Sequence, residues 1–561
     1  MNTFRRSACA AVLLVTSALS ADSLRAQSSL VPANHPVYSW LEMQRVNGRV
    51  PTYQDEVRPQ SRATVLLLLR ELAGDSLNLA RSHRHLLRDF LNEFDTERLI
   101  ANRLITRDFF RNFPGSVKDA IAARTDPVLY AGRTADSVFS GAFYLQIGLG
   151  DMRLSENGDT RSGYLTTKGF KAFVNTSFGL GFHAQAENAY INSNRELLAR
   201  DEKLGSPFQY RAEKSDASSS YEAFVSYRRP YLEAHFGRGS IAMGPALTDP
   251  LIMRPDAPNI SFLRFQIGTP KLNLVSLHGS LDADPFLSTA FYNGDSVTTR
   301  VSPNRWVGMH RLTWQPKKQL TLALHEMTVY GARGFDFDYV NPVNPQFLSQ
   351  RDKGDRDNLF IGADIIVRPV AGTELFGSLL LDDIKRLGQL VKLDTSKLIL
   401  AVGARQRLLQ NVQLGASYTR SDPHMYTHWL QLNGWEQFGR PLGHTIGPNA
   451  TEKALRITSW LPLRTRLVVG ARYIKQGLNP VDVEGRVVKN VGGDLLNGLP
   501  NDYPGLFNGA DLYNTRRIEV ELETEIIRAL NISLKLHDAS VDGGQQLRSN
   551  RFVDFRLRYG F

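Results

Sequence analysis

The C-terminal segment of the chain alternates between apolar and charged side chains. The apolar set is Val553, Phe555, Leu557, Tyr559 and Phe561, and the charged set between them is Asp554, Arg556 and Arg558. Because side chains of a β-strand point to opposite faces in turn, the segment predicts a strand with one apolar and one charged face. This pattern is typical of the last strand of an outer-membrane β-barrel, one of the two structures that satisfy all backbone hydrogen bonds inside a bilayer.

The first residues have the pattern of a secretory signal peptide. Two arginines precede an apolar stretch from Ala8 to Leu19, and cleavage is expected after Ala21 or Ala26. The stretch is too short to span a bilayer, and no later segment holds the roughly twenty apolar residues of a membrane helix. Cys9, the only cysteine, lies within it, so the mature chain is expected to form no disulfide. Residues 1–26 are therefore predicted to direct export.

The hydrophobic pattern between Pro36 and Phe113 is helical. One predicted segment runs from Val37 to Val46, and a second begins near Ser61 and stops at Gly74. A third carries an apolar stripe at helical spacing. The stripe consists of Leu79, His83, Leu86, Leu87, Phe90 and Phe94. We expect residues 27–130 to form a periplasmic helical bundle.

From about Ser137 onward the period changes to two, which predicts β-strands. Candidate strands start near Ser137, Tyr164, Leu180, Ser219, Tyr231, Ile260, Lys271, Asn304, Gln319, Asn358, Gly372, Lys397, Asn411, Ala454, Thr465, Tyr513, Leu530 and Ser549. Their even number, about eighteen, fits a single-chain bacterial barrel. The fold class predicted for residues 131–561 is an all-β transmembrane barrel with antiparallel strands.

The connections between the candidate strands support this fold. If the amino end is periplasmic, odd-numbered connections should be long extracellular loops and even-numbered ones short turns. Tight links occur at Phe178-Gly179, Arg229-Pro230, Thr269-Pro270, Gln315-Pro316-Lys317, Val370-Ala371-Gly372, Leu409-Gln410, Pro462-Leu463 and Arg528-Ala529. Long segments lie between them at 192–218, 241–259, 282–303, 330–357, 421–453 and 476–512. A β-protein that does not cross a membrane has no reason to alternate in this way.

The formal charge of +11 could favour acidic partners. Anionic polysaccharide and the phosphates of lipopolysaccharide are candidates, whereas a composition bias without a partner explains the charge equally well. Outer-membrane lipid and the barrel-assembly machinery, which would recognise the terminal Phe561, are further expected partners. Nucleic acid is not expected.

No catalytic motif is apparent. The histidines are scattered, none lies in a nucleophile motif, and Gly-x-Ser-x-Gly is absent. His424 and His428 are four residues apart but lack the acid of a zinc-binding HExxH motif. We expect no enzyme activity, no metal and no cofactor.

Charged residues at inward positions of the candidate strands could line the lumen. These are Asp364, Glu374, Asp382, Arg466, Arg472, Arg517, Glu519 and Glu521. They could select ions or sugars in a pore, or they could pair across the interior and hold plugging loops in place. The mixture of signs favours pairing.

Two long loops hold aromatic residues beside acids and imidazoles. The candidates for glycan binding are Phe335, Asp336, Phe337, Asp338 and Tyr339 in one loop, and Tyr426, Trp429, Trp435 and His444 in another. Flat aromatic rings beside hydrogen-bonding groups suit the mixed apolar and hydroxyl surface of a sugar. An interfacial aromatic girdle or the packing of loop cores would explain the same residues.

Several segments resemble the Wzi capsule-assembly outer-membrane proteins. They are Phe236-Gly237-Arg238 with Gly244-Pro245, His325-Glu326-Met327 with Asn341-Pro342, Asp357-Asn358 with Gly362-x-Asp364, Leu381-Asp382-Asp383, Tyr418-Thr419-Arg420 with Tyr426, and Leu442-Gly443-His444 with Gly447-Pro448-Asn449. The resemblance extends from about Val37 to the C-terminus. It departs from the family at Ala246, where a second glycine is expected.

This resemblance implies an eighteen-stranded barrel with a periplasmic helical bundle and a lumen blocked by its own loops. It also implies a non-catalytic surface lectin that binds exported capsular or extracellular polysaccharide and helps to attach or assemble it. No individual binding residue is carried over from the family. The alternative function is an outer-membrane pore or transporter for sugars or anions, working through the charged lumen.

Overall fold

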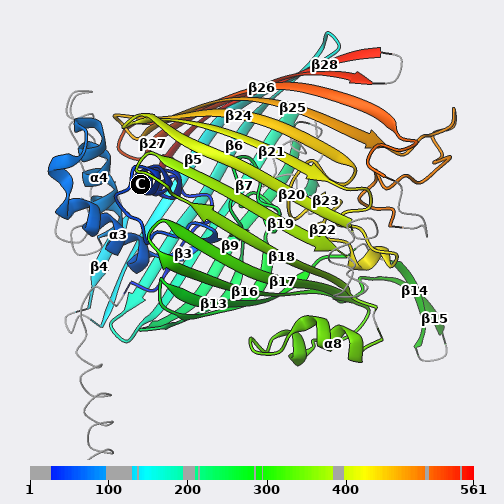
Figure 1. The fold of residues 1–561 in the computed structure, drawn as a ribbon, viewed down its shortest axis with the longest axis horizontal. Coiled ribbons are helices and arrows are strands. Elements are labelled where there is room, and N and C mark those ends of the chain that lie inside the picture. Colours follow the sequence, from blue (N-terminus) through cyan, green and yellow to red (C-terminus); the bar gives the residue numbers. More distant parts are fainter. Residues whose placement is uncertain are drawn as a thin grey trace, which may run out of the picture.

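Eighteen antiparallel strands in the described part of the chain close into a barrel (Figure 1). The structure, a computed structural model, describes residues 27–95, 129–134, 138–193, 197, 209–212, 215–283, 286–292, 295–354, 356–382, 397–498, 505–543 and 546–560. The last strand pairs with the first, from Asn550 beside Glu156 to Gly560 beside Gln146, so the ring has no free edge within these residues. The predicted fold class is confirmed.

The wall strands follow one another around the ring in chain order. They are β5 (Phe139–Glu156), β6 (Asp159–Thr176), β7 (Leu180–Ser193), β9 (Ser215–Arg229), β10 (Leu232–Gly239), β12 (Ile260–Gly268), β13 (Leu272–Leu281), β16 (Arg305–Lys317), β17 (Leu320–Gly331), β18 (Asn358–Val367), β19 (Thr373–Asp382), β20 (Lys397–Leu409), β21 (Val412–Ser421), β24 (Ala450–Leu461), β25 (Thr465–Leu478), β26 (Asp511–Ile527), β27 (Leu530–Gly543) and β28 (Gln546–Gly560). Two short strands, β4 (Tyr130–Arg133) and β8 (Gln209–Ala212), pair with β5 and β9.

The strand β28 has the two faces that its sequence predicts. Asp554, Arg556 and Arg558 line the lumen, whereas Phe555 lies on the opposite face with 41% of its surface exposed. An apolar outer surface is what a bilayer requires, and water inside the barrel tolerates the charges. The terminal Phe561 lies outside the described residues.

Short and long connections lie at opposite ends of the barrel, which we call the short-turn end and the long-loop end. Seven of the eight predicted tight links fall where one wall strand ends and the next begins, whereas Gln315-Pro316-Lys317 forms the last residues of β16 and the turn follows it. The expectation that every connection at the other end is long is wrong for the turn between β5 and β6. There Asn157 and Gly158 have φ angles of 50° and 97°, which two-residue hairpin turns require.

The N-terminal helices pack at the short-turn end (Figure 1). They are α2 (Pro36–Val46), α3 (Arg62–Gly74) and α4 (Arg81–Phe94), with a short η2 (Ser76–Asn78). The Ser61 hydroxyl caps α3 by accepting a hydrogen bond from the Thr64 N–H, and the predicted stripe of α4 lies in a core that includes Trp460 of β24. The predicted helical pattern beyond Asp95 lies outside the described residues.

None of the helices that the structure describes is long and apolar enough to cross a membrane. The N-terminal helices are instead tied to the short turns. The Ala80 N–H donates to Gln410 Oε1 at 2.8 Å, Arg464 pairs with Glu93 at 2.9 Å, and Arg528 pairs with Asp89 at 2.9 Å.

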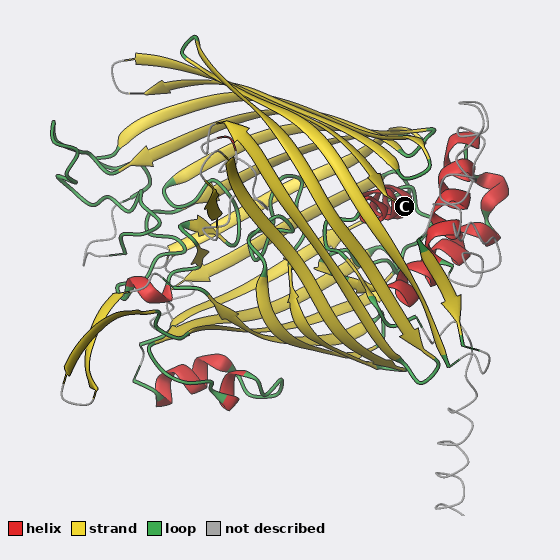
Figure 2. Cartoon of the chain, turned by 180° about the vertical axis from the view of Figure 1, so that it is seen from behind, coloured by secondary structure: helices red, strands yellow, loops and turns green. Residues whose placement is uncertain are grey.

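Two long connections fold into the lumen (Figure 2), and we call residues 240–259 and 422–449 the lumen loops. The first contains β11 (Ala242–Met243), which pairs with β2 (Val57–Arg58) of the N-terminal segment. Apolar residues of both loops share one core with the inner face of β12 to β20. One side of the lumen is therefore filled by the protein itself.

Smaller elements complete the described structure. They are β1 (Leu30–Val31) paired with β3 (Gln60–Ser61), the hairpin of β14 (Phe286–Tyr292) and β15 (Asp295–Val301), η3 (Phe337–Tyr339) and α8 (Gln346–Asp352) between β17 and β18, and η5 (Gln431–Asn433), β22 (Glu436–Gln437) and β23 (Arg440–Pro441) in the second lumen loop.

Candidate functional site

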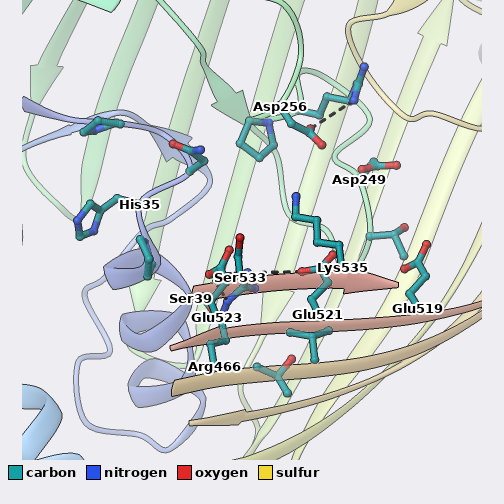
Figure 3. Close-up of a pocket in the computed structure, with 18 of the residues that line it drawn as sticks. His35, Ser39, Asp249, Asp256, Arg466, Glu519, Glu521, Glu523, Ser533 and Lys535 are labelled. Atoms are coloured by element: carbon teal, nitrogen blue, oxygen red, sulfur yellow. Dashed lines mark hydrogen bonds and ion pairs between the residues drawn. The ribbon is translucent and has the colours of Figure 1, made fainter. Parts of the chain in front are cut away.

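The side of the lumen opposite the apolar loop core is a polar cavity of about 1270 Å³. Its walls come from β24 to β28 and β5 to β9, from α2 and from the first lumen loop. Figure 3 shows Ser39 of α2 and Asp249 and Asp256 of that loop facing strands that carry Glu519, Glu521, Glu523, Arg466 and Lys535. The cavity extends along nearly the full length of β27, from Asn531 to Val541.

Ion pairs line this cavity and tie the first lumen loop to the wall. Arg466 lies 3.0 Å from Glu523 and 3.5 Å from Glu521. Arg472 lies 3.2 Å from Glu519 and 3.8 Å from Asp249. Because Asp249 belongs to the first lumen loop, Arg472 links that loop to the barrel wall. Asp249 is held below its usual pKa chiefly by Arg472, despite its burial.

A second cluster of charges joins the N-terminal segment to the wall. Arg45 of α2 lies 2.5 Å from Asp55, 2.9 Å from Glu56 and 3.0 Å from Glu374 of β19. Arg405 of β20 lies 2.8 Å from the same Glu374. These side chains are almost completely excluded from solvent, so each charge depends on its partners.

Arg405 also reaches the first lumen loop and α2. It donates to the Ala246 carbonyl, and it lies 2.5 Å from Glu42. Burial raises the pKa of Glu42 to about 7, outweighing the attraction of Arg405. Helix, loop and wall therefore meet at one guanidinium group.

The structure places all eight predicted lumen charges in ion pairs. Besides those above, Asp364 pairs with Arg311, Asp382 lies 3.3 Å from Lys397, and Arg517 lies 3.4 Å from Glu519. Sequence reasoning missed Arg45 of the N-terminal segment, which pairs with Glu374, and the two further acids that Arg45 holds, Asp55 and Glu56. No local pattern marks them, because they look like ordinary surface charges in a helical region.

Four of the nine predicted glycan-binding residues are buried. Tyr339, Tyr426, Trp435 and His444 have no exposed surface. Tyr426 donates to the Leu251 carbonyl at 2.6 Å, and Trp435 Nε1 donates to the Ile252 carbonyl at 2.8 Å. Because they are buried, these four side chains cannot contact a polysaccharide outside the barrel. Their packing holds the loops.

The other predicted glycan-binding residues are accessible, and their role stays a prediction. Phe337 is 79% exposed, Trp429 56% and Phe335 42%, while Asp336 is partly buried and Asp338 exposed. The Trp429 ring lies 5.3 Å from the His428 ring. The structure does not bring the two sets together, because the Phe335 group lies outside the wall and Trp429 belongs to the second lumen loop.

A smaller groove of about 390 Å³ opens between the second lumen loop and the loop after β25. Its lining shares Pro441, Thr445, Ile446 and Gln476 with the lumen cavity. The two hollows therefore meet at these residues. The loop after β25 also packs on the second lumen loop at Gly498, where an added Cβ would lie 1.9 Å from the His428 carbonyl oxygen.

A closed ring with an apolar outer face, a charged lumen and loops folded inside defines an outer-membrane β-barrel with a partly filled interior. No protein-family profile matches the chain, and no curated protein matches its sequence.

Solved structures nevertheless share its fold. The chain is similar to Wzi of Escherichia coli, described as an outer-membrane protein involved in group 1 capsule assembly and a carbohydrate-binding β-barrel. The two are 12% identical, the match covers 94% of this chain and 99% of Wzi, and the TM-score is 0.54. The architecture implied by the family resemblance is thus confirmed at the level of the fold.

Two outer-membrane proteins of Pseudomonas aeruginosa match less well. OpdK, solved with vanillate, is 10% identical over 75% of this chain and 99% of its own, with a TM-score of 0.39. OprD is 10% identical over 77% and 97%, also with a TM-score of 0.39. Likeness at this level carries no argument about function.

Proposed function

We propose that the protein is a non-catalytic barrel that binds extracellular or capsular polysaccharide and helps to attach or assemble it at the cell surface. The observation that carries the proposal is the use of two long loops as an internal plug. A diffusion pore needs an unobstructed lumen, whereas a surface-binding protein needs loops held in a fixed shape. The proposal is also supported by the shared fold with Wzi, the carbohydrate-binding barrel.

The binding surface that we propose is the long-loop end around Trp429. Its indole is more than half exposed. The loop that carries it is held in place by the buried Trp435 and Tyr426, which form hydrogen bonds with the first lumen loop. A rigidly held, exposed indole can stack on the apolar face of a sugar ring with little loss of conformational entropy. The groove next to this loop, lined by apolar and polar residues, offers Thr445, Gln476 and Asp494 for hydroxyl groups.

The test is binding of the purified barrel to an array of bacterial capsular polysaccharides. Trp429→Ala should weaken binding by about 1–2 kcal/mol, or roughly 5- to 30-fold in Kd. Val483→Ala is the matched control, because Val483 is 99% exposed on the neighbouring loop. Absence of binding to any polysaccharide, together with unchanged cell-bound glycan in a deletion strain, would refute the proposal.

A second candidate function is passage of small polar solutes. It is favoured by one observation, the contact between the lumen cavity and the groove at the long-loop end. Planar-bilayer recordings separate the two candidates. A steady conductance of the wild-type barrel would favour transport, whereas a silent barrel that binds polysaccharide would favour attachment.

A further inference from the structure

Residues 332–354 and 356–357, between β17 and β18, lie against the outside of the barrel wall. Figures 1 and 2 show α8 of this segment beside the ring of strands. Ser276 of β13 donates to the Val340 carbonyl at 3.2 Å, and Thr328 of β17 donates to Gln346 Oε1 at 2.8 Å. On β16, an added Cβ at Gly308 would lie 3.0 Å from the Tyr339 side chain. We call this segment the outer flap.

The contacted wall residues face away from the lumen. Their strand neighbours Leu277, Val307 and Met327 belong to the core inside the barrel. Because side chains alternate along a strand, Ser276, Gly308 and Thr328 point outward. The flap therefore covers a surface that would otherwise face the surroundings of the barrel.

The outer face of β16 and β17 is apolar toward the short-turn end and mixed beneath the flap, where Trp306 and Tyr330 lie beside His278. On β16, Trp314 and Leu312 are 51% and 44% exposed, and the next outward residue is His310. On β17, Leu324 is 64% exposed, and the next outward residue is Glu326, which lies 3.0 Å from His310. The outer face thus changes from aliphatic to ionisable within two residues.

The apolar part alone is too short to cross a bilayer. A transmembrane strand needs about 9–11 residues, and β16 and β17 have 13 and 12. The hydrophobic band must therefore include most of each strand, including the half covered by the flap. Lipid at that level would meet polar wall residues unless the flap took their place.

The flap has the surface that this position requires. Val343 is 82% exposed, Phe337 79% and Leu348 44%, so its surface carries large apolar side chains, with the exposed Arg351, Asp352 and Arg356 at its C-terminal end. Five of its charged side chains pair within the segment. Arg333 lies 2.6 Å from Asp357, and Lys353 lies 2.5 Å from Asp338 and 3.0 Å from Asp336.

We propose that the outer flap is immersed in the lipid leaflet at the long-loop end and replaces the strands as the surface that lipid contacts there. Val343, Leu348 and Phe337 are the side chains that touch acyl chains. The apolar belt formed by Leu312 and Leu324 continues onto them beyond the His310–Glu326 pair. This assignment goes beyond polysaccharide binding and gives Phe337 a lipid partner in place of a glycan.

The test uses single-cysteine variants carrying a fluorescent probe; the only native cysteine, Cys9, lies in the predicted signal peptide, so the introduced cysteine is the only one in the mature chain. The barrel is reconstituted into phosphatidylcholine vesicles containing lipids with a nitroxide near the head of one acyl chain. Labels at Val343→Cys and Leu348→Cys should be quenched as strongly as a label at Leu324→Cys on the bare wall. A label at Val483→Cys, on an exposed long loop, should not be quenched.

Quenching at positions 343 and 348 that matches the Val483 control, together with quenching at Leu324, would overturn the proposal. The Leu324 label shows in the same experiment that the barrel is folded and inserted. Neither result depends on Trp429, so failure here is distinguishable from failure of polysaccharide binding.

Discussion

Removal of the Arg45 side chain should weaken the attachment of the N-terminal segment to the barrel. Its guanidinium, 1% exposed, holds three buried carboxylates: Asp55, Glu56 and Glu374. Arg45→Ala leaves these acids with fewer cations, and breaking a buried ion pair costs about 3–5 kcal/mol. Because about 1.4 kcal/mol corresponds to a tenfold change in an equilibrium constant, local opening of the segment should become roughly 10²- to 10⁴-fold more frequent.

Amide hydrogen exchange of residues 30–60 measures this opening directly. The control is Arg70→Ala, because Arg70 lies 3.0 Å from Asp95 but has 40% of its side chain exposed, and such pairs contribute at most about 1 kcal/mol. Far-UV circular dichroism checks that the barrel stays folded in both variants. Exchange in Arg45→Ala within a few-fold of wild type would refute the reasoning that this cluster fastens the segment.

Three further outcomes are expected. Burial raises the pKa of Glu42 to about 7 from a usual 4.5, so its contribution to docking is full below pH 4.5 and is lost as the pH rises through 7. Glu42→Gln should flatten the pH dependence of the melting temperature of the N-terminal helices. An unchanged slope would assign the pH dependence to another group. Trp435→Ala removes a buried side chain that donates a hydrogen bond to the Ile252 carbonyl, which should lower the stability of the packed lumen loops by about 3–5 kcal/mol. The loosened loops should raise single-channel conductance. A variant with the conductance of wild type would contradict this. Phe561→Ala should lower outer-membrane levels if assembly machinery reads the terminal aromatic residue, as quantified by immunoblotting of membrane fractions.

The barrel itself could be predicted from the sequence because its determinants are local. Alternation of side chains marks a strand wherever one face meets lipid, and Gly or Pro marks the turns. The tight link at Phe178-Gly179 is an example, since Gly179 adopts φ 88° between β6 and β7. The Asn157-Gly158 turn carries an equally local signal and could have been recognised from the same rule.

The interior could not be predicted, because its contacts join residues far apart in the chain. Trp435 and Trp429 lie in the same loop, yet one is buried against Ile252 and the other is exposed. No periodicity separates them, since the direction in which a long loop folds depends on the barrel around it. For the same reason the sequence pointed to Phe337 as a sugar contact and gave no sign that its loop lies against the outer wall.

The ties between the N-terminal segment and the short turns have a consequence for the order of assembly. In the N-terminal segment, Val46 and His83 form hydrogen bonds with Gly372 and Gln410 of two short turns, and Asp89 forms an ion pair with Arg528 of a third. One segment therefore contacts hairpins spread around much of the rim. Those hairpins are neighbours in space only after the sheet has curled into a cylinder. The N-terminal segment can therefore make these contacts together only after the ring has closed, so its docking reports that closure is complete.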